Sequence, residues 1–216
     1  MEEKKITEQE SLDIITRMIE QTKQESSIGS GNMFLMWGYL SAIVSLGVFV
    51  LMKLYPTVSW GLLFTAIIVV GFIATLIMQR KERKNKNAIT TYSTNSINGV
   101  WQCISLVFAI CFIYCSCDKE SQTVWNGMFL LGLLLPGIGT YCTGKTLKEW
   151  KLQLCGIIGM FSGLDFLEEL CKGVQYITPE WCLEMAITMV IALVIPGHIL
   201  NRKARKTRKK IESCKS

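Results

Sequence analysis

Residues Met33–Met52 read MFLMWGYLSAIVSLGVFVLM, twenty consecutive residues without a charged side chain. A helix of about 20 apolar residues spans the hydrocarbon core of a bilayer. Backbone amides in hydrocarbon must bond within their own segment, so such a run is expected to be helical. The stretch therefore predicts a membrane-spanning helix.

Further apolar runs follow it along the chain, and their bounds are 60–78, 100–117, 124–142, 152–170 and 181–200. The mean hydropathy is +0.34, and the charged residues, 19% of the chain, gather between the runs. A soluble domain usually carries about 25% charged residues. The period-two alternation of a membrane barrel is absent. The sequence therefore predicts an all-α membrane protein, with six transmembrane helices in three hairpins.

This membrane domain, 33–200, is expected to lie between an N-terminal segment, 1–32, and a basic tail, 201–216. The N-terminal segment is polar and acid-rich, unlike a cleavable signal peptide. We therefore expect the first apolar run to be retained and to act as the targeting signal.

The basic residues predict the orientation. Of the 23 Lys and Arg residues, all but Lys53, Lys119 and Lys172 lie before the first run, after the second and fourth runs, or in the tail. Basic residues near helix ends are retained on the cytoplasmic side. Both termini are therefore expected in the cytoplasm of a bacterial inner membrane. The net charge of +6 then indicates orientation and attraction of the tail to anionic lipid, rather than nucleic-acid binding.

Residues 7–25 predict a short cytoplasmic amphipathic helix. Thr7–Glu10 reads TEQE and matches a capping box. Apolar positions then follow at helical spacing: Leu12, Ile15, Met18 and Ile19. A Gly/Ser linker, 26–32, joins it to the first run. Because so short a helix is marginal alone, it is expected to dock on a protein partner, on another copy of the chain or on the chain's own loops. The alternative is that it lies at the membrane interface without a partner.

Candidate polar sites lie near the ends of the last two runs. Asp165, Glu168 and Glu169, spaced i, i+3, i+4, project from one side of a helix. Ionisable residues in membrane segments suggest function by default. Asp165 could pair with Glu184 through a cation or proton in an external vestibule. The alternative is that the helix simply emerges at this point.

His198, the single histidine, lies near the predicted cytoplasmic end of the last run. It is expected to anchor that end or to hydrogen-bond a neighbour, and its titration near neutral pH leaves a pH-sensor hypothesis. One histidine does not make a His-based metal site. No metal, cofactor or catalytic residue is predicted.

Small residues predict close contacts between helices. Gly159 and Gly163 form a G-x-x-x-G step beside Gly156, and Gly38 has a similar role in the first run. Most of the nine cysteines are expected to act as small hydrophobes. Four near the outer ends could form disulfides in an oxidising compartment, with the pairing left open: Cys115, Cys117, Cys171 and Cys182.

Residues 139–146 read GTYCTGKT and match the phosphate-binding pattern G-x-x-x-x-G-K-[ST]. A phosphate loop follows a β-strand, whereas these residues follow the body of an apolar helix. The match is therefore interpreted as coincidental, with Gly139 and Gly144 ending the helix and Lys145 holding that end in the cytoplasm. Motifs of intramembrane enzymes are also absent, so we expect a protein that is not an enzyme.

Several local patterns are distributed along the chain: Glu10-Ser11-Leu12, Trp37-Gly38, Trp101, Thr143-Gly144-Lys145 and Ile195-Pro196-Gly197. Together they resemble a functionally uncharacterised family of small six-helix bacterial integral membrane proteins. The resemblance implies the architecture and brings no activity.

Two functions fit these observations. The first is a regulatory, sensor or partner-binding subunit that acts through its cytoplasmic segments, as a monomer or a homo-oligomer. The second is a small transporter or permease subunit with a site near Asp165 and Glu184, because interrupted helices often frame substrate sites. The pairs Pro136-Gly137 and Pro196-Gly197 would supply the interruptions.

Overall fold

A computed structural model of the chain describes residues 9, 12, 30–56, 60–85, 92–117, 122–173 and 176–213. Within these ranges the protein is helical and has no strand. The elements are α2 (Ser30–Leu54), the 3-10 turn η1 (Gly61–Leu63), α3 (Phe64–Asn85), α4 (Tyr92–Cys117), α5 (Gln122–Thr146), α6 (Trp150–Cys171), α7 (Pro179–Met189), the π-helical turn η2 (Val190–Val194) and α8 (Ile195–Ser213). The prediction of an all-α fold is confirmed.

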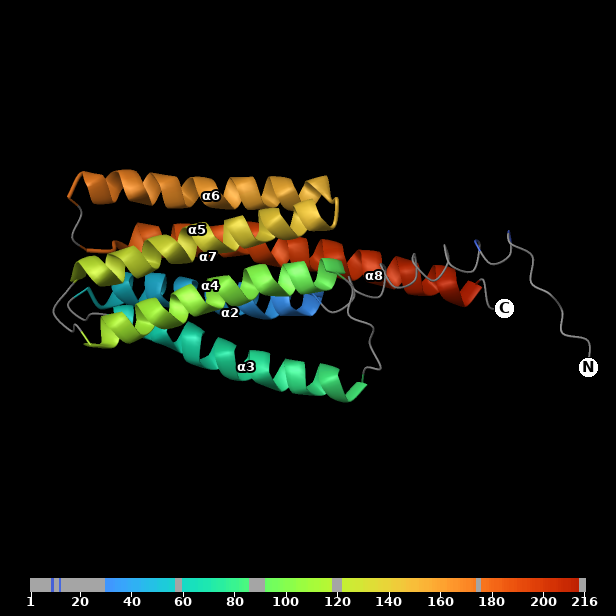
Figure 1. Cartoon of the computed structure of the whole chain (residues 1–216). Coiled ribbons are helices and arrows are strands. Elements are labelled where there is room, and N and C mark those ends of the chain that lie inside the picture. The colour runs from blue at the N-terminus through green and yellow to red at the C-terminus, as the bar shows by residue number, and fades with distance from the viewer. Residues whose placement is uncertain are drawn as a thin grey trace, which may run out of the picture.

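The helices lie side by side, and the direction alternates from each helix to the next from α2 to α7 (Figure 1). The last three elements, α7, η2 and α8, follow one another without a break. Together they form one rod, called the C-terminal rod below. It extends past the other helices at one end of the bundle (Figure 1).

The two ends of the bundle differ in charge. At the basic end α2 begins, α5 turns into α6, and α8 leaves the bundle (Figure 1). At the acidic end α6 finishes and α7 begins, and this end carries Asp165, Glu168, Glu169, Glu180 and Glu184. These two names are kept below.

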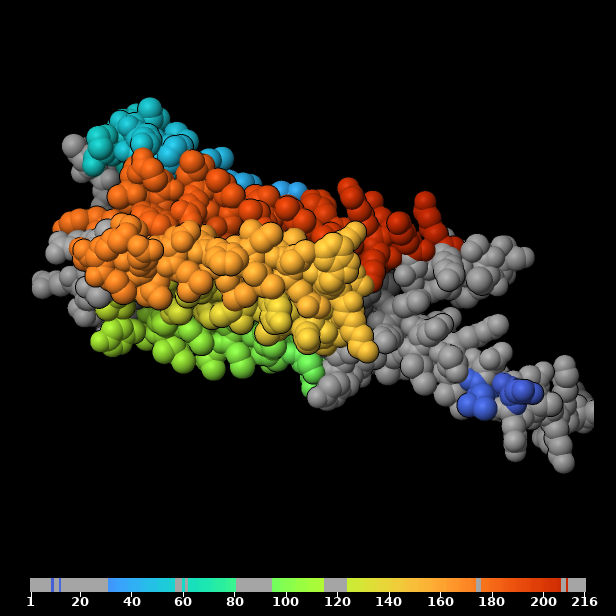
Figure 2. All heavy atoms as spheres, turned by 90° about the horizontal axis from the view of Figure 1, so that it is seen from above, coloured from blue at the N-terminus to red at the C-terminus, as the bar shows by residue number. Residues whose placement is uncertain are grey.

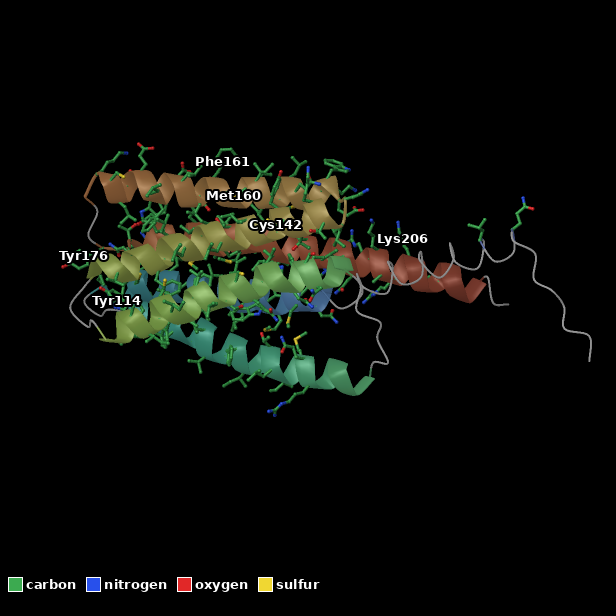
Figure 3. All side chains as sticks on the ribbon, in the orientation of Figure 1. Tyr114, Cys142, Met160, Phe161, Tyr176 and Lys206 are labelled. Carbon is green, nitrogen blue, oxygen red and sulfur yellow. The ribbon has the colours of Figure 1, made fainter. Side chains whose placement is uncertain are left out.

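Exposed aromatic residues mark both ends. Tyr114 and Tyr176, labelled in Figure 3, lie at the acidic end, with 60% and 69% of their surface exposed. Trp150, 63% exposed, opens α6 at the basic end. Trp and Tyr are enriched at the two interfaces of membrane proteins. The span Asn95–Tyr114 has 20 residues, a length of about 30 Å, which matches the hydrocarbon core.

Four helical spans in the described ranges are long and apolar enough to cross a membrane: Gly31–Leu54, Asn95–Tyr114, Val124–Thr146 and Pro179–Lys206. The apolar part of α3, Phe64–Arg80, is shorter. α6 carries four charged residues, Lys151, Asp165, Glu168 and Glu169. The structure therefore supports a membrane protein, and six crossings remain a prediction.

The helices divide into a central group and a peripheral pair. The most extensive contacts join α5 to α6 and α2 to the C-terminal rod, whereas α3 packs mainly on α2, and α4 on α5. Only 11% of the apolar span of α4 is buried, against 56% for α5. The core lies within the central group and includes Phe129, Leu133, Leu152, Phe166 and Met189. Since α5 and α6 belong to different predicted hairpins, the grouping into three hairpins stays a prediction.

Two element boundaries differ from those expected. α2 begins at Ser30, inside the predicted linker, because Gly31 packs against the rod and Asn32 bonds to Asn201. These contacts outweigh the low helix propensity of glycine. The tail is helical as far as Ser213 and continuous with the last span, since Lys and Arg are good helix formers.

The predicted amphipathic helix lies mostly outside the described residues. Leu12 is helical and 63% exposed. Ile15, Met18 and Ile19 lie outside the described ranges. The amphipathic helix therefore stays a prediction.

Candidate functional site

At the acidic end, carboxylates pair with two lysines. The Lys172 ammonium lies 2.8 Å from Glu168 Oε1 and 2.9 Å from Glu169 Oε1. Lys53, near the end of α2, bonds to Glu180 of α7 at 2.6 Å. The hydrogen bond with Glu168, and then that with Glu169, raises the pKa of Lys172 above its ordinary value. These pairs are exposed, which fits the alternative in which α6 emerges from the membrane at this point.

Asp165 and Glu184 lie close enough for their charges to interact, and their pairing through a cation or proton stays a prediction. Asp165 is exposed on α6, Glu184 is partly buried on α7, and their charges interact. His198 does not join them: it follows Glu184 by 14 residues in the rod, about 21 Å along a helix. The five candidate polar residues therefore fall into separate groups at the two ends.

Aromatic rings fill the bundle beside Asp165. The ring centroids of Phe129 and Phe166 are 5.0 Å apart, and those of Phe166 and Trp181 are 4.9 Å apart. Phe64 of α3 extends the series at 5.7 Å from Phe129. Such edge-to-face contacts pack tightly. The bundle next to Phe166 is therefore filled, and no cluster of three or more His, Cys, Asp or Glu able to hold a metal occurs in the described ranges.

His198 bonds to Tyr39 of α2 at the other end of the bundle. The Tyr39 hydroxyl lies 2.8 Å from His198 Nε2, and both side chains are exposed. The rings meet edge to face, with centroids 6.1 Å apart. The histidine therefore has a defined neighbour on α2, which the sequence did not identify.

The C-terminal rod is interrupted in its middle by the π-turn η2. The Ile195 amide donates to the Val190 carbonyl, five residues back. Pro196 has no amide hydrogen, so the Ala192 carbonyl loses its usual partner four residues on. The Thr140 hydroxyl of α5 donates to that carbonyl at 2.7 Å. A side chain from another helix thus replaces the missing backbone donor, inside the core.

Two further buried hydroxyl groups bond to each other one helical turn away, between α6 and α7. Thr188 Oγ1 donates to Ser162 Oγ at 2.8 Å, and Ser162 Oγ donates to the Gly159 carbonyl at 3.1 Å. A Cβ at Gly159 would lie 2.9 Å from the Ala192 Cβ. The interruption is therefore packed tightly, and the hydroxyls of Thr140, Ser162 and Thr188 are all hydrogen-bonded, which avoids the cost of an unpaired polar group in hydrocarbon.

The other predicted packing glycines also lie at close helix contacts. Cβ atoms added at Gly38, Gly156 and Gly163 would approach Val194, Tyr141 and Leu134 respectively within 3.0 Å. The contact at Gly156 is the tightest to a backbone: the Cβ would lie 2.6 Å from the Tyr141 amide nitrogen. α5 and α6 are therefore in backbone contact, and Figure 3 shows Met160 and Cys142 in this part of the pair.

Residues 139–146 belong to the continuous helix α5. Their backbone amides serve the helix, so the stretch does not form the open cradle of amides that holds a phosphate. The prediction that Gly139 and Gly144 end the helix is wrong, because both glycines lie within α5. A Cβ added at Gly144 would lie 2.7 Å from the Gln153 amide nitrogen of α6. α5 ends at Thr146 because Lys148 takes φ 56°, and the Glu149 amide bonds back to the Gly144 carbonyl at 2.8 Å.

Two tryptophans clasp the peripheral helices in the same way. Trp101 of α4 lies over Gly139 of α5 and donates from Nε1 to Thr143 Oγ1 at 3.1 Å, while Thr143 donates to the Gly139 carbonyl at 2.7 Å. Between α2 and α3, Trp37 of α2 lies over Gly71 of α3 and donates from Nε1 to Thr75 Oγ1 at 3.1 Å. Thr75 donates in turn to the Gly71 carbonyl at 2.8 Å. The sequence analysis missed both clasps, although Gly-x-x-x-Thr stands at 71–75 and at 139–143.

The cysteines described at the acidic end are free thiols. Cys171 is exposed, whereas Cys182 is buried with its sulfur 3.8 Å from Met52 Sδ. Side chains of Cys115 and Cys117 lie outside the described residues. Cys171 and Cys182 are therefore not joined by a disulfide.

Comparison of the chain with protein-family models, curated proteins and solved structures gives no match. The resemblance to a family of six-helix bacterial membrane proteins therefore stays an expectation, and function is argued from the geometry alone.

Proposed function

We propose that the chain is a multi-pass protein of the bacterial inner membrane that binds a protein partner and acts as a regulatory or sensor subunit, not as an enzyme. In this proposal α3 and α6 complete six crossings, and both termini lie in the cytoplasm. The observation that carries the proposal is that the two cytoplasmic segments leave the bundle at one point.

That point is the contact between the start of α2 and α8. A Cβ at Gly31 would lie 3.1 Å from the Gly197 carbonyl oxygen, and one at Gly197 would lie 3.0 Å from the Gly31 carbonyl oxygen. Asn201 Nδ2 donates to Asn32 Oδ1 at 2.9 Å. The start of α2, to which residues 1–29 are joined, therefore lies beside the helix that carries the basic tail. A partner at this point can contact both.

Two contacts place the basic helix there. Lys203 pairs with Glu149 at the start of α6, and Ala204 is buried. Beyond the bundle α8 exposes Arg205, Lys206 and Lys209, and Lys206 is labelled on this extension in Figure 3. Residues 1–29 carry seven acidic and four basic side chains. The proposed partner surface therefore combines a cationic helix with the apolar stripe of residues 7–25.

The experiment compares what co-purifies with the full chain in mild detergent after cross-linking. One variant replaces Leu12, Ile15, Met18 and Ile19 by Gln. Its matched control replaces Asp13, Arg17, Glu20 and Lys23 by Gln, on the predicted polar face. We expect the partner to be lost from the first variant and retained by the control. An unchanged set of partners after deletion of residues 1–26 refutes the proposal.

The six crossings are tested separately by epitope tags. Tags within 86–91 and after residue 216 should be reached only from the cytoplasm, and tags within 118–121 and 174–175 only from outside. Tags at 118–121 and 174–175 on opposite sides of the membrane would exclude the six-span topology.

A second candidate is a small transporter, and the interruption of the C-terminal rod favours it. Broken helices at the membrane midplane frame substrate sites in many transporters, and Glu184 lies in the same rod and interacts electrostatically with Asp165. Transport that survives both Asp165→Asn and Glu184→Gln would rule out this site.

A further inference from the structure

One face of the C-terminal rod changes from apolar to cationic along its length. Ile187 and Ile195 are 52% and 42% exposed, and His198, Arg202 and Arg205 are exposed further along. The positions from 195 onward are separated by three, four and three residues, so they share one face of the helix. Lys209 continues the series. The polar and cationic residues therefore begin where the apolar residues end.

α2 supplies a second apolar stripe next to this face. Its exposed residues are Tyr39, Ile43, Leu46 and Val50, again at spacings of four and three. α2 packs along the rod, and the bond between Tyr39 and His198 joins the two stripes on the same side. We call the combined surface the α2–α8 face. It is formed by Tyr39, Ile43, Leu46, Val50, Ile187, Ile195, His198, Arg202, Arg205 and Lys209.

We propose that the α2–α8 face binds one anionic phospholipid. The acyl chains lie along Ile43, Leu46 and Ile187, and the phosphate bonds to the guanidinium groups of Arg202 and Arg205. Tyr39 occupies Nε2 of His198, so Nδ1 is the ring nitrogen that meets a headgroup oxygen. The proposal requires α2 and the rod to lie in a bilayer, and it stands apart from the protein partner proposed above.

Charge and geometry both select an anionic headgroup. Arginine binds phosphate through two parallel N–H donors, which gives bonds that are stronger and more directional than those of lysine. Basic pockets between helix ends at a membrane surface bind anionic headgroups. In the described part of this face no carboxylate stands among the cations. Lys203, on another side of α8, is already paired with Glu149.

The lysines at the turn between α5 and α6 lack these features. Lys145, Lys148 and Lys151 are exposed around the turn between α5 and α6. They are lysines, and Lys151 lies 6.0 Å from the Trp150 ring centroid rather than beside a hydrogen-bonded pair. This turn therefore provides a control of equal charge.

The test measures lipid retained by the delipidated full-length protein, using native mass spectrometry with added phosphatidylglycerol or phosphatidylcholine. We expect one phosphatidylglycerol to bind about tenfold more tightly than phosphatidylcholine. Arg202→Gln with Arg205→Gln should abolish that preference, and Lys145→Gln with Lys148→Gln should change it less than about twofold. Tyr39→Phe should weaken binding by about threefold, the loss of one hydrogen bond.

Equal loss in both double variants would overturn the proposal, because attraction would then follow total charge. An unchanged preference in the arginine variant, or no preference in the native chain, would overturn it too. All replaced side chains are exposed, and a thermal unfolding curve in phosphatidylcholine nanodiscs verifies that each variant is folded.

Discussion

α6 and α4 both pack on α5, but through different chemistry. The backbones of α5 and α6 touch where Gly137 and Gly144 of α5 lie against Gly156 and Gln153 of α6. α4 touches α5 through the ring of Trp101, which covers Gly139 and bonds to Thr143. α3 is held on α2 in the same manner as α4 on α5. α5 and α6 therefore meet backbone to backbone, and α3 and α4 meet their neighbours through side chains, with one tryptophan in each contact.

This difference indicates which contacts between helices can open while the rest of the protein stays folded. Backbone atoms in contact cannot move aside as a side chain can by changing its rotamer. Separating α5 from α6 therefore removes the whole packed surface between them at once. The clasp of α4 on α5 rests on the ring and one hydrogen bond of Trp101, and only 11% of the apolar span of α4 is buried. Figure 2 shows α6 over the near face of the bundle and α4 along its edge. Motion in this protein is therefore expected at α3 and α4.

The largest expected effect comes from Gly156→Ala. The new Cβ would lie 2.6 Å from the Tyr141 amide nitrogen and 2.7 Å from the Gly137 carbonyl oxygen, and neither backbone atom can turn aside. We expect the free energy of unfolding to fall by about 3 kcal/mol, measured by denaturant titration in mixed micelles. The matched control is Gly127→Ala on α5, where nothing lies within 4 Å. Equal stabilities of the two variants would disprove backbone contact between α5 and α6.

The next effect concerns the interruption of the C-terminal rod. Thr140→Val removes the donor to the Ala192 carbonyl while keeping the shape of the side chain, and should destabilise the protein by about 2 kcal/mol. Pro196→Ala supplies an amide that can bond to the same carbonyl. In that background Thr140→Val should cost less than about 1 kcal/mol. Additive effects in the double-mutant cycle would show that the hydroxyl does not substitute for the proline amide.

Much of the fold could be predicted from the sequence because lipid imposes a simple rule. Charge-free runs such as Met33–Met52 must be helical in hydrocarbon, and the blocks of basic residues indicate one end of the bundle. The choice of neighbours does not follow from that rule, since every face of such a helix is apolar. The pairing of α5 with α6, and the single rod from Pro179 to Ser213, therefore appear only in the structure.

The candidate site was predictable only in part, for a related reason. Asp165 and Glu184 stand out because charges are rare in apolar runs. The partner of His198 is Tyr39, 159 positions away in the chain, and Thr140 and Pro196 are far apart too. Such pairs leave no local pattern. The Gly-x-x-x-Thr repeats are visible in the sequence, but their spacing shows only that the two residues share a helix face. The sequence does not show which tryptophan of another helix covers them.

A smaller effect is expected from Trp101→Phe, which keeps an aromatic ring over Gly139 but removes the donor to Thr143. One hydrogen bond contributes about 1 kcal/mol. Because α4 is peripheral, we expect faster hydrogen exchange of its amides, with α5 and α6 still protected. Trp150→Phe is the control, since Trp150 is 63% exposed at the start of α6. Faster exchange throughout the bundle would show that α4 and the centre open as one unit.

The smallest expected effect has the opposite sign and concerns the turn that joins α5 to α6. Lys148 takes φ 56°, a left-handed conformation that costs an ordinary residue about 1 kcal/mol and costs glycine almost nothing. Lys148→Gly should therefore stabilise the protein by about 0.5 kcal/mol, after the greater chain entropy of glycine in the unfolded state is subtracted. Lys145→Gly makes the same change three residues earlier, inside α5, and should destabilise by about 1 kcal/mol. Both lysines are exposed, so the two variants differ chiefly in the backbone conformation at the replaced residue. If both substitutions destabilise equally, the turn is not held in the left-handed conformation, and the close approach of α5 and α6 does not depend on it.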